Sequence, residues 1–220
     1  MKVCTDACIL AAWTAEKMKN NSIKNILDIG SGTGLLSLML AQKINASIDA
    51  VELDPHAAEQ AQENVFASMW HDHIHVIQTD LLHFVPGIKY DLIISNPPFF
   101  EDDLRSANDQ KNAAKHDTGL KLHELITAAS AHINKKGRFV VLLPFHRTKY
   151  FEEEAESKGF HVHERLYIKQ SPVHDHFRSV LVLGKEEMPE VHVQELIIHD
   201  REKNYTAAFT SLLKEYYLKL

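Results

Sequence analysis

The sequence predicts an α/β fold with a mostly parallel sheet and helices on both of its faces. Short apolar runs alternate with longer amphipathic stretches along the chain, which indicates alternating strands and helices. Several of the apolar runs are continuous, as is typical of strands that are covered on both faces. The 220 residues contain no repeat and no obvious linker, so we expect a single domain over residues 1–220.

Seven apolar runs are predicted to be strands, at residues 24–30, 47–53, 74–80, 90–96, 138–144, 161–169 and 178–184. Four stretches between them have helical patterns, at residues 35–43, 55–68, 121–133 and 149–159. Pro55 suits the first turn of its helix, because an N–H at that position would have no partner within the helix. Residues 134–137 are expected to stop the preceding helix.

The composition narrows the class of protein. No apolar stretch approaches the roughly 20 residues that span a bilayer, and the N-terminus lacks a signal-peptide pattern, so we expect no membrane partner. Cys4 and Cys8 form no disulfide framework and make a poor zinc site, which favours a reducing cytoplasm. The 15 histidines include no H-E-x-x-H helix, so we expect no metal. The oligomeric state is left open, with a monomer favoured.

The residues just after each strand are the candidates for a binding site, because such sheets bind ligands at the carboxyl ends of their strands. Gly30, Gly32 and Gly34 follow the first strand, where they permit a tight turn and a close approach by a ligand. The dinucleotide fingerprint would need a glycine at Leu35, and the P-loop would need Gly-Lys-Ser/Thr. Both of these nucleotide-binding motifs are therefore excluded.

Acidic residues mark the first three strands. Asp28, inside the first strand, is costly unless its carboxylate accepts bonds from the loop amides or meets a cation held there. Glu52 ends the second strand, where an acid is placed to accept both ribose hydroxyls of a nucleoside. Asp80 ends the third strand, where it could accept from an adenine amino group. The alternative is that all of these are helix-cap and turn residues.

The three strand ends together resemble class I S-adenosylmethionine-dependent methyltransferases. "DIGSGTG" is similar to the first motif of that family, "VELD" to its second and "QTD" to its third. The resemblance implies a Rossmann-like sheet of seven strands with the last one antiparallel, and S-adenosyl-L-methionine as cofactor. It implies cofactor contacts from Thr5, Asp28, Gly30, Ser31, Gly32, Gly34, Glu52, Leu53, Asp80, Leu81 and Asn96.

The fourth strand is followed by "NPPF", and the candidate catalytic residues there are Asn96, Pro97 and Phe99. A planar nitrogen is a poor nucleophile because its lone pair is delocalised. The Asn96 side-chain oxygen and the Pro97 carbonyl could accept its two N–H groups and favour the attacking form. Phe99 could stack on the planar substrate. The motif resembles the [DN]-P-P-[FYW] signature of amino- and amide-directed methyltransferases.

Three segments point to one family of such enzymes. "MKVCTDACILAAW", "YDLIISNPPFF" and "LIIHDREKNYTAAFTSLLKEYYL" resemble bacterial methyltransferases of valine tRNA, which act on N6 of the adenine 3′ of the anticodon. The resemblance covers essentially the whole chain, with residues 1–20 near the cofactor and residues 185–220 as a C-terminal strand and helix. Cys4 and Ala7 depart from its pattern. The family normally has some residues before this segment, so either the sequence is cut or annotated short at Met1 or this member lacks them, and both interpretations stay open. Thr5 and Asp6 equally suit a helix N-cap.

The RNA contacts are the least defined part of the prediction. The net charge of −6 argues against a surface that binds nucleic acid all over, but a local basic face is compatible with it. Candidate phosphate contacts are Arg105, Lys111, Lys115, His116, Arg147, Lys169 and Arg178, with Arg138 and Lys149 as further candidates. The polar loop around Lys111 could instead be simply solvated. Two other functions remain as alternatives. One is the N-methylation of a release-factor glutamine or of a base amine in rRNA or DNA, and the other is RNA binding without catalysis.

Overall fold

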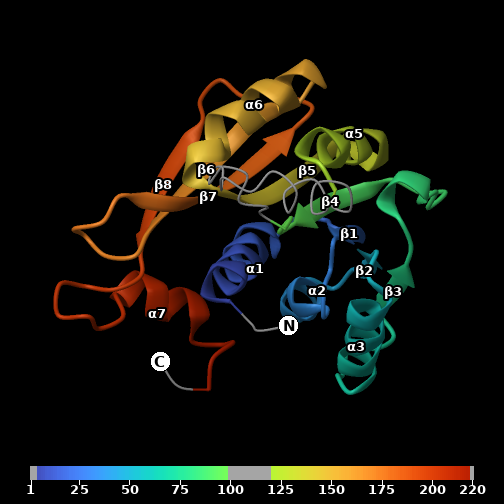
Figure 1. Cartoon of the computed structure of the whole chain (residues 1–220), viewed down its shortest axis with the longest axis horizontal. Helices are drawn as coiled ribbons and strands as arrows, with labels where there is room; N and C mark the ends of the chain where they lie inside the picture. The colour runs from blue at the N-terminus through green and yellow to red at the C-terminus, as the bar shows by residue number, and fades with distance from the viewer. Residues whose placement is uncertain (1–3, 99–119, 219–220) are drawn as a thin grey trace, which may run out of the picture.

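A single eight-stranded sheet forms the middle layer of the protein in the computed structural model, which describes residues 4–98 and 120–218 (Figure 1). The strands are β1 (Asn25–Ile29), β2 (Ser47–Glu52), β3 (Ile74–Gln78), β4 (Tyr90–Ser95), β5 (Ile133–Pro144), β6 (His161–Lys169), β7 (His176–Gly184) and β8 (His192–Ile197). The helices are α1 (Thr5–Met18), α2 (Leu35–Ala41), α3 (Pro55–Phe66), α5 (Leu122–His132), α6 (Thr148–Ser157) and α7 (Ala207–Leu213). Two short 3-10 helices, η1 (Leu81–His83) and η2 (Phe145–Arg147), follow β3 and β5.

The strand order is β3-β2-β1-β4-β5-β7-β6-β8, and β7 runs antiparallel to both of its neighbours. All other pairs are parallel. The predicted α/β class and the antiparallel seventh strand are therefore confirmed. β8 adds an eighth strand, in the C-terminal segment, and pairs in parallel with β6. The order reverses direction between β1 and β4, which is where open α/β sheets bind their ligands.

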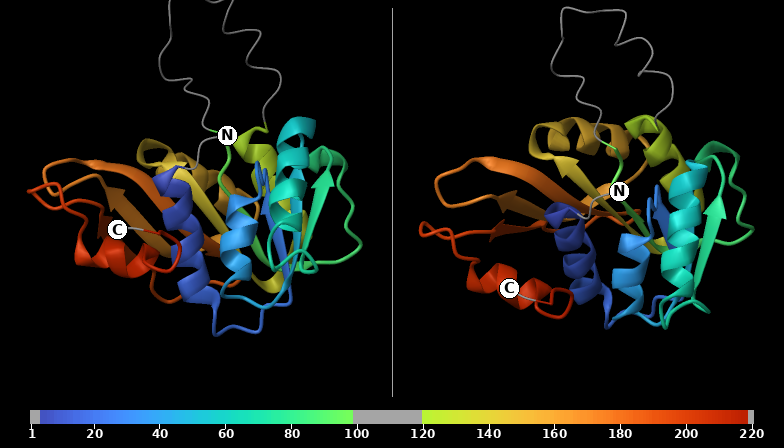
Figure 2. Two further views of the ribbon diagram at one scale, coloured as in Figure 1. Left: turned by 90° about the horizontal axis from the view of Figure 1, so that it is seen from below. Right: turned by 60° about the horizontal axis from the view of Figure 1, so that its bottom comes forward.

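The helices divide between the two faces of the sheet. α1, α2, α3 and α7 cover one face, and α5 and α6 cover the other (Figures 1 and 2). Successive strand residues point to opposite faces. Ile26 and Val140 therefore belong to the apolar cluster under α1 and α2, while Leu27 and Val141 belong to the cluster under α5 and α6. This burial on both faces explains the continuous apolar runs in the sequence.

The start of β5 differs from the prediction. α5 ends at His132, and residues 134–137, which we expected to stop the helix, already lie in β5. Ile133 pairs with Tyr90, and a register shift between Tyr90 and Leu92 absorbs the extra residues before the regular pairing begins. Asn134 donates from Nδ2 to Asp91 Oδ1 at 2.6 Å, which holds this extension against β4.

α1 is buried along almost its whole length. Its residues from Ala7 to Ala15 are all buried, because the helix lies between the sheet, α2 and α7. The structure corrects the capping prediction: Thr5 is the first helical residue, and the N-cap position belongs to Cys4, which makes no side-chain cap bond. Among the described residues, no helix combines the length and the apolar character that crossing a membrane requires.

Candidate active site at the carboxyl edge of the sheet

The carboxyl ends of the central strands come level with one another. Ile29 of β1 pairs with Val51 of β2 and with Ser95 of β4. One residue further along each strand are Gly30, Glu52 and Asn96. Three segments that are far apart in the sequence thus place their candidate residues side by side at one edge, as the strand-end rule predicts.

The turn after β1 needs its glycines. Gly30, Gly32 and Gly34 have φ angles of +69°, +56° and +82°, a region that other residues adopt only with strain. A Cβ on Gly34 would lie 3.5 Å from the Cβ of Ala61 in α3. A Cβ on Gly30 would meet nothing within 4 Å, so the backbone there is open to an approaching ligand.

Glu52 faces this turn from the end of β2. Its Oε2 accepts a hydrogen bond from Gly32 N at 2.7 Å, and its Oε1 accepts one from Asp54 N at 2.9 Å. Each carboxylate oxygen can accept a further bond, so both remain available to hydroxyl donors. The next residue, Leu53, is 52% exposed and could cover a ligand from the side of β2.

Asp28 is fully buried in β1. Its Oδ2 accepts bonds from the Ser37 hydroxyl at 2.7 Å and from Ser37 N at 3.2 Å, so α2, rather than the glycine turn, provides its donors. Burial raises the pKa of Asp28 to about 7, and the nearby charge of Glu52 adds to this, while the bonds from Ser37 oppose it. The carboxyl therefore keeps its proton to a higher pH than an exposed aspartate does.

Asp80 and Leu81 follow β3. Asp80 caps η1, because its Oδ1 accepts from Leu82 N at 2.9 Å, and its Oδ2 lies 3.4 Å from His83 Nδ1. Asp80 is thus a helix-cap residue, as the alternative prediction had it, and its Oδ1 makes the cap bond. Leu81 is buried against the core under α5.

Asn96 and Pro97 leave the end of β4 beside the glycine turn. The Ser95 hydroxyl donates to Ile29 O at 2.9 Å and ties the end of β4 to the end of β1. Pro97 is buried and Pro98 is exposed. Phe99, the third candidate catalytic residue, lies outside the described residues.

Unpartnered polar atoms gather at this edge. Within the described part of the chain, four buried side-chain oxygens have no hydrogen-bond partner: Asp28 Oδ1, Ser31 Oγ, Asn96 Oδ1 and Thr14 Oγ1. The first three belong to the strand ends just described, and Thr14 lies inside α1. A buried polar atom without a partner costs about 1–3 kcal/mol, so three at one edge indicate a place where a polar ligand supplies the partners.

Comparisons with known proteins decide the family. Residues 11–154 match the model of the methyltransferase small domain. A tRNA1(Val) (adenine(37)-N6)-methyltransferase from Dyadobacter fermentans is 40% identical over all of this chain and 91% of its own length. Proteins of the same name from Haemophilus influenzae (40%) and Klebsiella pneumoniae (39%) match over 100% and 99% of this chain and 92% and 89% of their own lengths. The chain belongs to the tRNA1(Val) (adenine(37)-N6)-methyltransferase family.

Solved structures support the fold of this family member. A predicted O-methyltransferase from Agrobacterium tumefaciens has a TM-score of 0.71 at 19% identity and covers 94% of this chain and 95% of its own. A glycopeptide N-methyltransferase, solved with S-adenosyl-L-methionine, has a TM-score of 0.62 at 10% identity, with 82% and 94% coverage. At these identities the likeness concerns the methyltransferase fold alone.

The residues of this family member fit S-adenosyl-L-methionine. The open backbone at Gly30 admits a ligand, and the Glu52 carboxylate suits the two ribose hydroxyls. The buried Asp28 Oδ1 and Ser31 Oγ offer polar contacts for which the described residues provide no partner. Acidic groups next to a glycine turn also suit the positive charge of that cofactor.

The N-terminus of α1 reaches the same edge through an ion pair. Asp6 Oδ2 accepts from Arg178 Nε at 2.9 Å, which joins α1 to β7. Burial alone would raise the pKa of Asp6, but bonds from Cys4 and Arg178 outweigh it and lower the pKa. Arg178, a predicted RNA contact, therefore also anchors the N-terminal segment. Thr5, a predicted cofactor contact, is exposed at the start of this helix.

The other basic candidates divide between the two edges. Arg147 follows β5, and Lys169 ends β6, so both share the edge of Asn96. Lys169 Nζ lies 2.9 Å from Glu195 Oε2. Arg138 donates to Lys136 O at 2.9 Å near the opposite end of β5, so the structure does not bring it to the site. Lys149, on α6, is paired with Glu153 at 3.9 Å, and the four candidates Arg105, Lys111, Lys115 and His116 lie outside the described residues.

Sequence reasoning missed an aromatic cluster at this edge. Phe145, Tyr167 and His176 come from the ends of β5 and β6 and the start of β7, and their rings are in contact. The signal that could have found them is the strand-end rule itself, applied to aromatic as well as polar residues.

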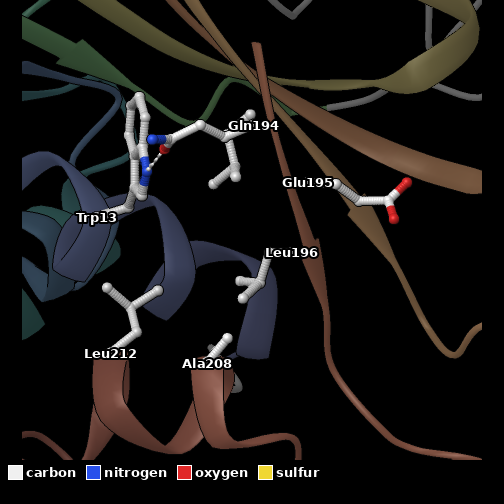
Figure 3. A pocket seen from close by; sticks show the side chains of 7 residues that line it. Trp13, Gln194, Glu195, Leu196, Ala208 and Leu212 are labelled. Carbon is white, nitrogen blue, oxygen red and sulfur yellow. Dashed lines mark hydrogen bonds between the residues drawn. The ribbon is translucent and has the colours of Figure 1, made fainter.

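A pocket of about 420 Å³ lies elsewhere, between α1, β8 and α7 (Figure 3). Trp13 stands in it and donates from Nε1 to Gln194 Oε1 at 3.1 Å, with Leu196, Ala208 and Leu212 around it. β8 is five positions from β1 in the sheet, which is about 24 Å at the usual strand spacing. The pocket is therefore separate from the candidate active site.

Proposed function

We propose that this protein transfers a methyl group from S-adenosyl-L-methionine to N6 of adenine 37 in a valine-accepting tRNA. The observation that carries the proposal is Asn96, whose buried Oδ1 has no partner in the described residues and stands level with Gly30 and Glu52. The 40% identity to full-length relatives that carry this activity in their names supports the choice of substrate.

The cofactor would lie across the ends of β1, β2 and β3. The backbone of Gly30–Gly34 and Ser31 would hold its methionine part, Glu52 with Leu53 its ribose, and Asp80 with Leu81 its adenine. Asp28 would sit behind the turn, and positive charge bound there would favour the ionised form of its carboxyl. When bound, S-adenosyl-L-methionine supplies an electrophilic methyl group on a positively charged sulfur.

Asn96 and Pro97 would prepare the adenine nitrogen. The Asn96 Oδ1 and the Pro97 carbonyl would accept the two N6 hydrogens and draw the nitrogen out of conjugation with its ring. The consecutive prolines fix both acceptors before the substrate arrives, so little reorganisation is needed as the new N–C bond forms. The bond between the methyl carbon and the sulfur would break at the same time, and its electron pair would stay on the departing neutral thioether. One N6 hydrogen then leaves as a proton to water, and no side chain has to act as a strong base. A stacking role for Phe99 stays a prediction.

The wider setting follows from the substrate. We infer one domain over residues 1–220, since a single sheet connects β1 to the C-terminal β8. A tRNA substrate would place the protein in the cytoplasm, and one tRNA for one chain requires no second copy, so we keep a monomer as the working state.

The test is to identify the methylated residue directly. The protein is incubated with isotope-labelled S-adenosyl-L-methionine and, separately, with total tRNA, ribosomal RNA or a release factor, and each product is digested and analysed by mass spectrometry. We expect labelled N6-methyladenosine from the anticodon loop of valine tRNA alone. Labelled glutamine, or label only in ribosomal RNA, would overturn the proposal, and no label with any substrate would favour a non-catalytic RNA-binding protein.

A further inference from the structure

The aromatic cluster at the carboxyl edge is partly exposed to solvent. Ring centroids are 5.2 Å apart for Phe145 and Tyr167, 4.9 Å for Phe145 and His176, and 5.2 Å for Tyr167 and His176. Phe145 is 36% exposed, and the other two are half-buried. We call these three residues the aromatic platform. Tyr167 and His176 lie in the neighbouring strands β6 and β7, and Phe145 is the first residue of η2, directly after β5, so the sheet largely sets their positions.

The platform lies close to Asn96. Ser95 of β4 pairs with Val141 of β5, so Asn96 is one residue beyond this pair and Phe145 is four. At about 3.3 Å per strand residue and about 4.8 Å between strands, the two are roughly 11 Å apart. A polynucleotide whose target base reaches Asn96 would carry its neighbouring nucleotides over Phe145.

The polar groups around the platform favour an anionic chain. Glu195 Oε2 accepts from His176 Nε2 at 2.7 Å and lies 2.9 Å from Lys169 Nζ. The hydrogen bond from Lys169, and to a smaller extent the one from His176, lowers the pKa of Glu195. One carboxylate therefore contacts one lysine ammonium and one histidine ring. Arg147 lies at the same edge, as does Arg178, whose guanidinium is paired with Asp6. The rings are tilted against one another, at 85° for Phe145 and Tyr167 and 36° for Phe145 and His176, so a base would stack on the exposed ring of Phe145 alone. An exposed aromatic ring with basic side chains beside it suits nucleobases and phosphates better than it suits an apolar peptide.

We propose that the aromatic platform stacks against a nucleobase that flanks the target adenine, with Lys169 next to its phosphate. This inference rests on the proposed function, because it supposes RNA at Asn96. Stacking of a base on an aromatic ring is worth about 1–3 kcal/mol and tolerates any base identity. The platform would therefore position the RNA without selecting its sequence.

The first experiment compares Phe145→Leu with Phe145→Trp and with Phe66→Leu. Phe66 ends α3 and is 83% exposed, so it is the matched exposed aromatic away from the site. Phe145→Leu should raise the KM for tRNA about 5-fold to 150-fold, from the value of one stacked base, and leave kcat and the Kd for S-adenosyl-L-methionine unchanged. Phe145→Trp should restore the KM, and Phe66→Leu should match the parent protein.

The second experiment uses the unaltered protein, so it does not depend on the folding of a variant. An anticodon stem-loop RNA carrying 4-thiouridine next to the target adenine is irradiated on the protein, and the linked peptides are identified by mass spectrometry. We expect links within residues 145–149 or 174–178. Cross-links found only elsewhere would overturn the platform. So would a KM for tRNA in Phe145→Leu equal to that of the parent protein, or an equal rise of this KM in Phe66→Leu.

The two proposals fail in different ways. If the protein methylates tRNA but Phe145→Leu binds RNA as the parent does, the platform alone is wrong. If no nucleoside is methylated while the stem-loop still links to the platform, the proposed reaction is wrong and the RNA surface stands. A stem-loop that does not bind at all contradicts the platform.

Discussion

The two edges of the sheet differ in whether some of their buried polar atoms lack hydrogen-bond partners among the described residues. At the amino edge, Asp91 Oδ2 accepts from Lys24 N at 2.9 Å and Asn25 N at 3.2 Å, and its Oδ1 accepts from Asn134 at 2.6 Å. Tyr90 donates from its hydroxyl to Asp49 at 2.6 Å. At the carboxyl edge, Asp28 Oδ1, Ser31 Oγ and Asn96 Oδ1 are buried and have no partner among the described residues.

We infer that the hydrogen-bonded side chains at the amino edge stabilise the fold, and that the unpartnered oxygens at the carboxyl edge bind a ligand. A carboxylate that accepts three donors lowers the free energy of the folded chain by itself. A buried oxygen without a donor raises that free energy until a ligand binds. We therefore expect changes at the amino edge to lower stability and changes at the carboxyl edge to lower activity.

The largest effect is expected for Asn96→Ala. If Asn96 accepts from the reacting nitrogen, its loss should lower kcat about 10²-fold to 10³-fold, as for other fixed transition-state contacts. Stability should hold, because the variant removes a buried unpartnered atom. The measurement is single-turnover methyl transfer to tRNA alongside thermal unfolding.

Asn134→Ala is its counterpart at the amino edge. It removes the bond to Asp91 and should cost about 1–3 kcal/mol of unfolding free energy, with unchanged kcat. Near parental turnover in Asn96→Ala, or a loss of turnover shared by both variants, would remove the distinction between the edges.

The next effect concerns Glu52→Ala. Loss of a charged acceptor for the ribose hydroxyls should weaken S-adenosyl-L-methionine binding about 10-fold to 100-fold in isothermal titration. Asp54→Ala is the control on the same turn, because Asp54 Oδ1 accepts from Ala57 N at 2.8 Å and caps α3. Its loss should cost about 1 kcal/mol of stability and little affinity. Equal losses of affinity would mean that the turn merely deforms.

Two glycines sharpen the comparison further. Gly30 and Gly159 have φ angles of +69° and +73°, and a Cβ on either would meet nothing within 4 Å. Alanine at each should therefore cost a similar strain, about 1–2 kcal/mol. Only Gly30→Ala should also lower the affinity for S-adenosyl-L-methionine, about 10-fold or more, because its Cβ would occupy the space of the ligand. Parental affinity in Gly30→Ala would refute an approach over that backbone.

A pH dependence of stability is expected from Asp28. Its pKa is raised by burial from 3.8 to about 7, so the folded protein holds this proton more tightly than the unfolded chain does. That contribution to stability is complete below about pH 4 and is lost as pH rises through about 7. Asp28→Asn lacks it, so urea titrations from pH 5 to pH 8 should show the variant gaining stability relative to the parent. A constant difference would contradict the buried carboxyl.

The strand ends could be predicted because their signals are local. The apolar run before Gly30, the acid at Glu52 and the proline pair after Asn96 each lie within a few residues, and the parallel sheet then brings them level. The early start of β5 could not be predicted, since it depends on the register shift opposite Tyr90.

Long-range partners account for the rest. Asp6 and Arg178 are 172 residues apart, and no pattern near Asp6 distinguishes an ion pair from the predicted cap. The pairing of β8 with β6, and the meeting of Phe145 with Tyr167 and His176, likewise depend on strand order. Such contacts follow from the topology and are invisible in a local pattern.

The most direct test is a crystal structure of the protein with S-adenosyl-L-homocysteine. We predict the ligand at the carboxyl edge, with its ribose on Glu52, its chain over Gly30 and a hydrogen-bond partner, ligand atom or ordered water, at Asp28 Oδ1 or Ser31 Oγ. The contacts of Asp91 should be unchanged. A ligand bound in the Trp13 pocket, or one at the carboxyl edge that leaves those oxygens unpartnered, would contradict the account.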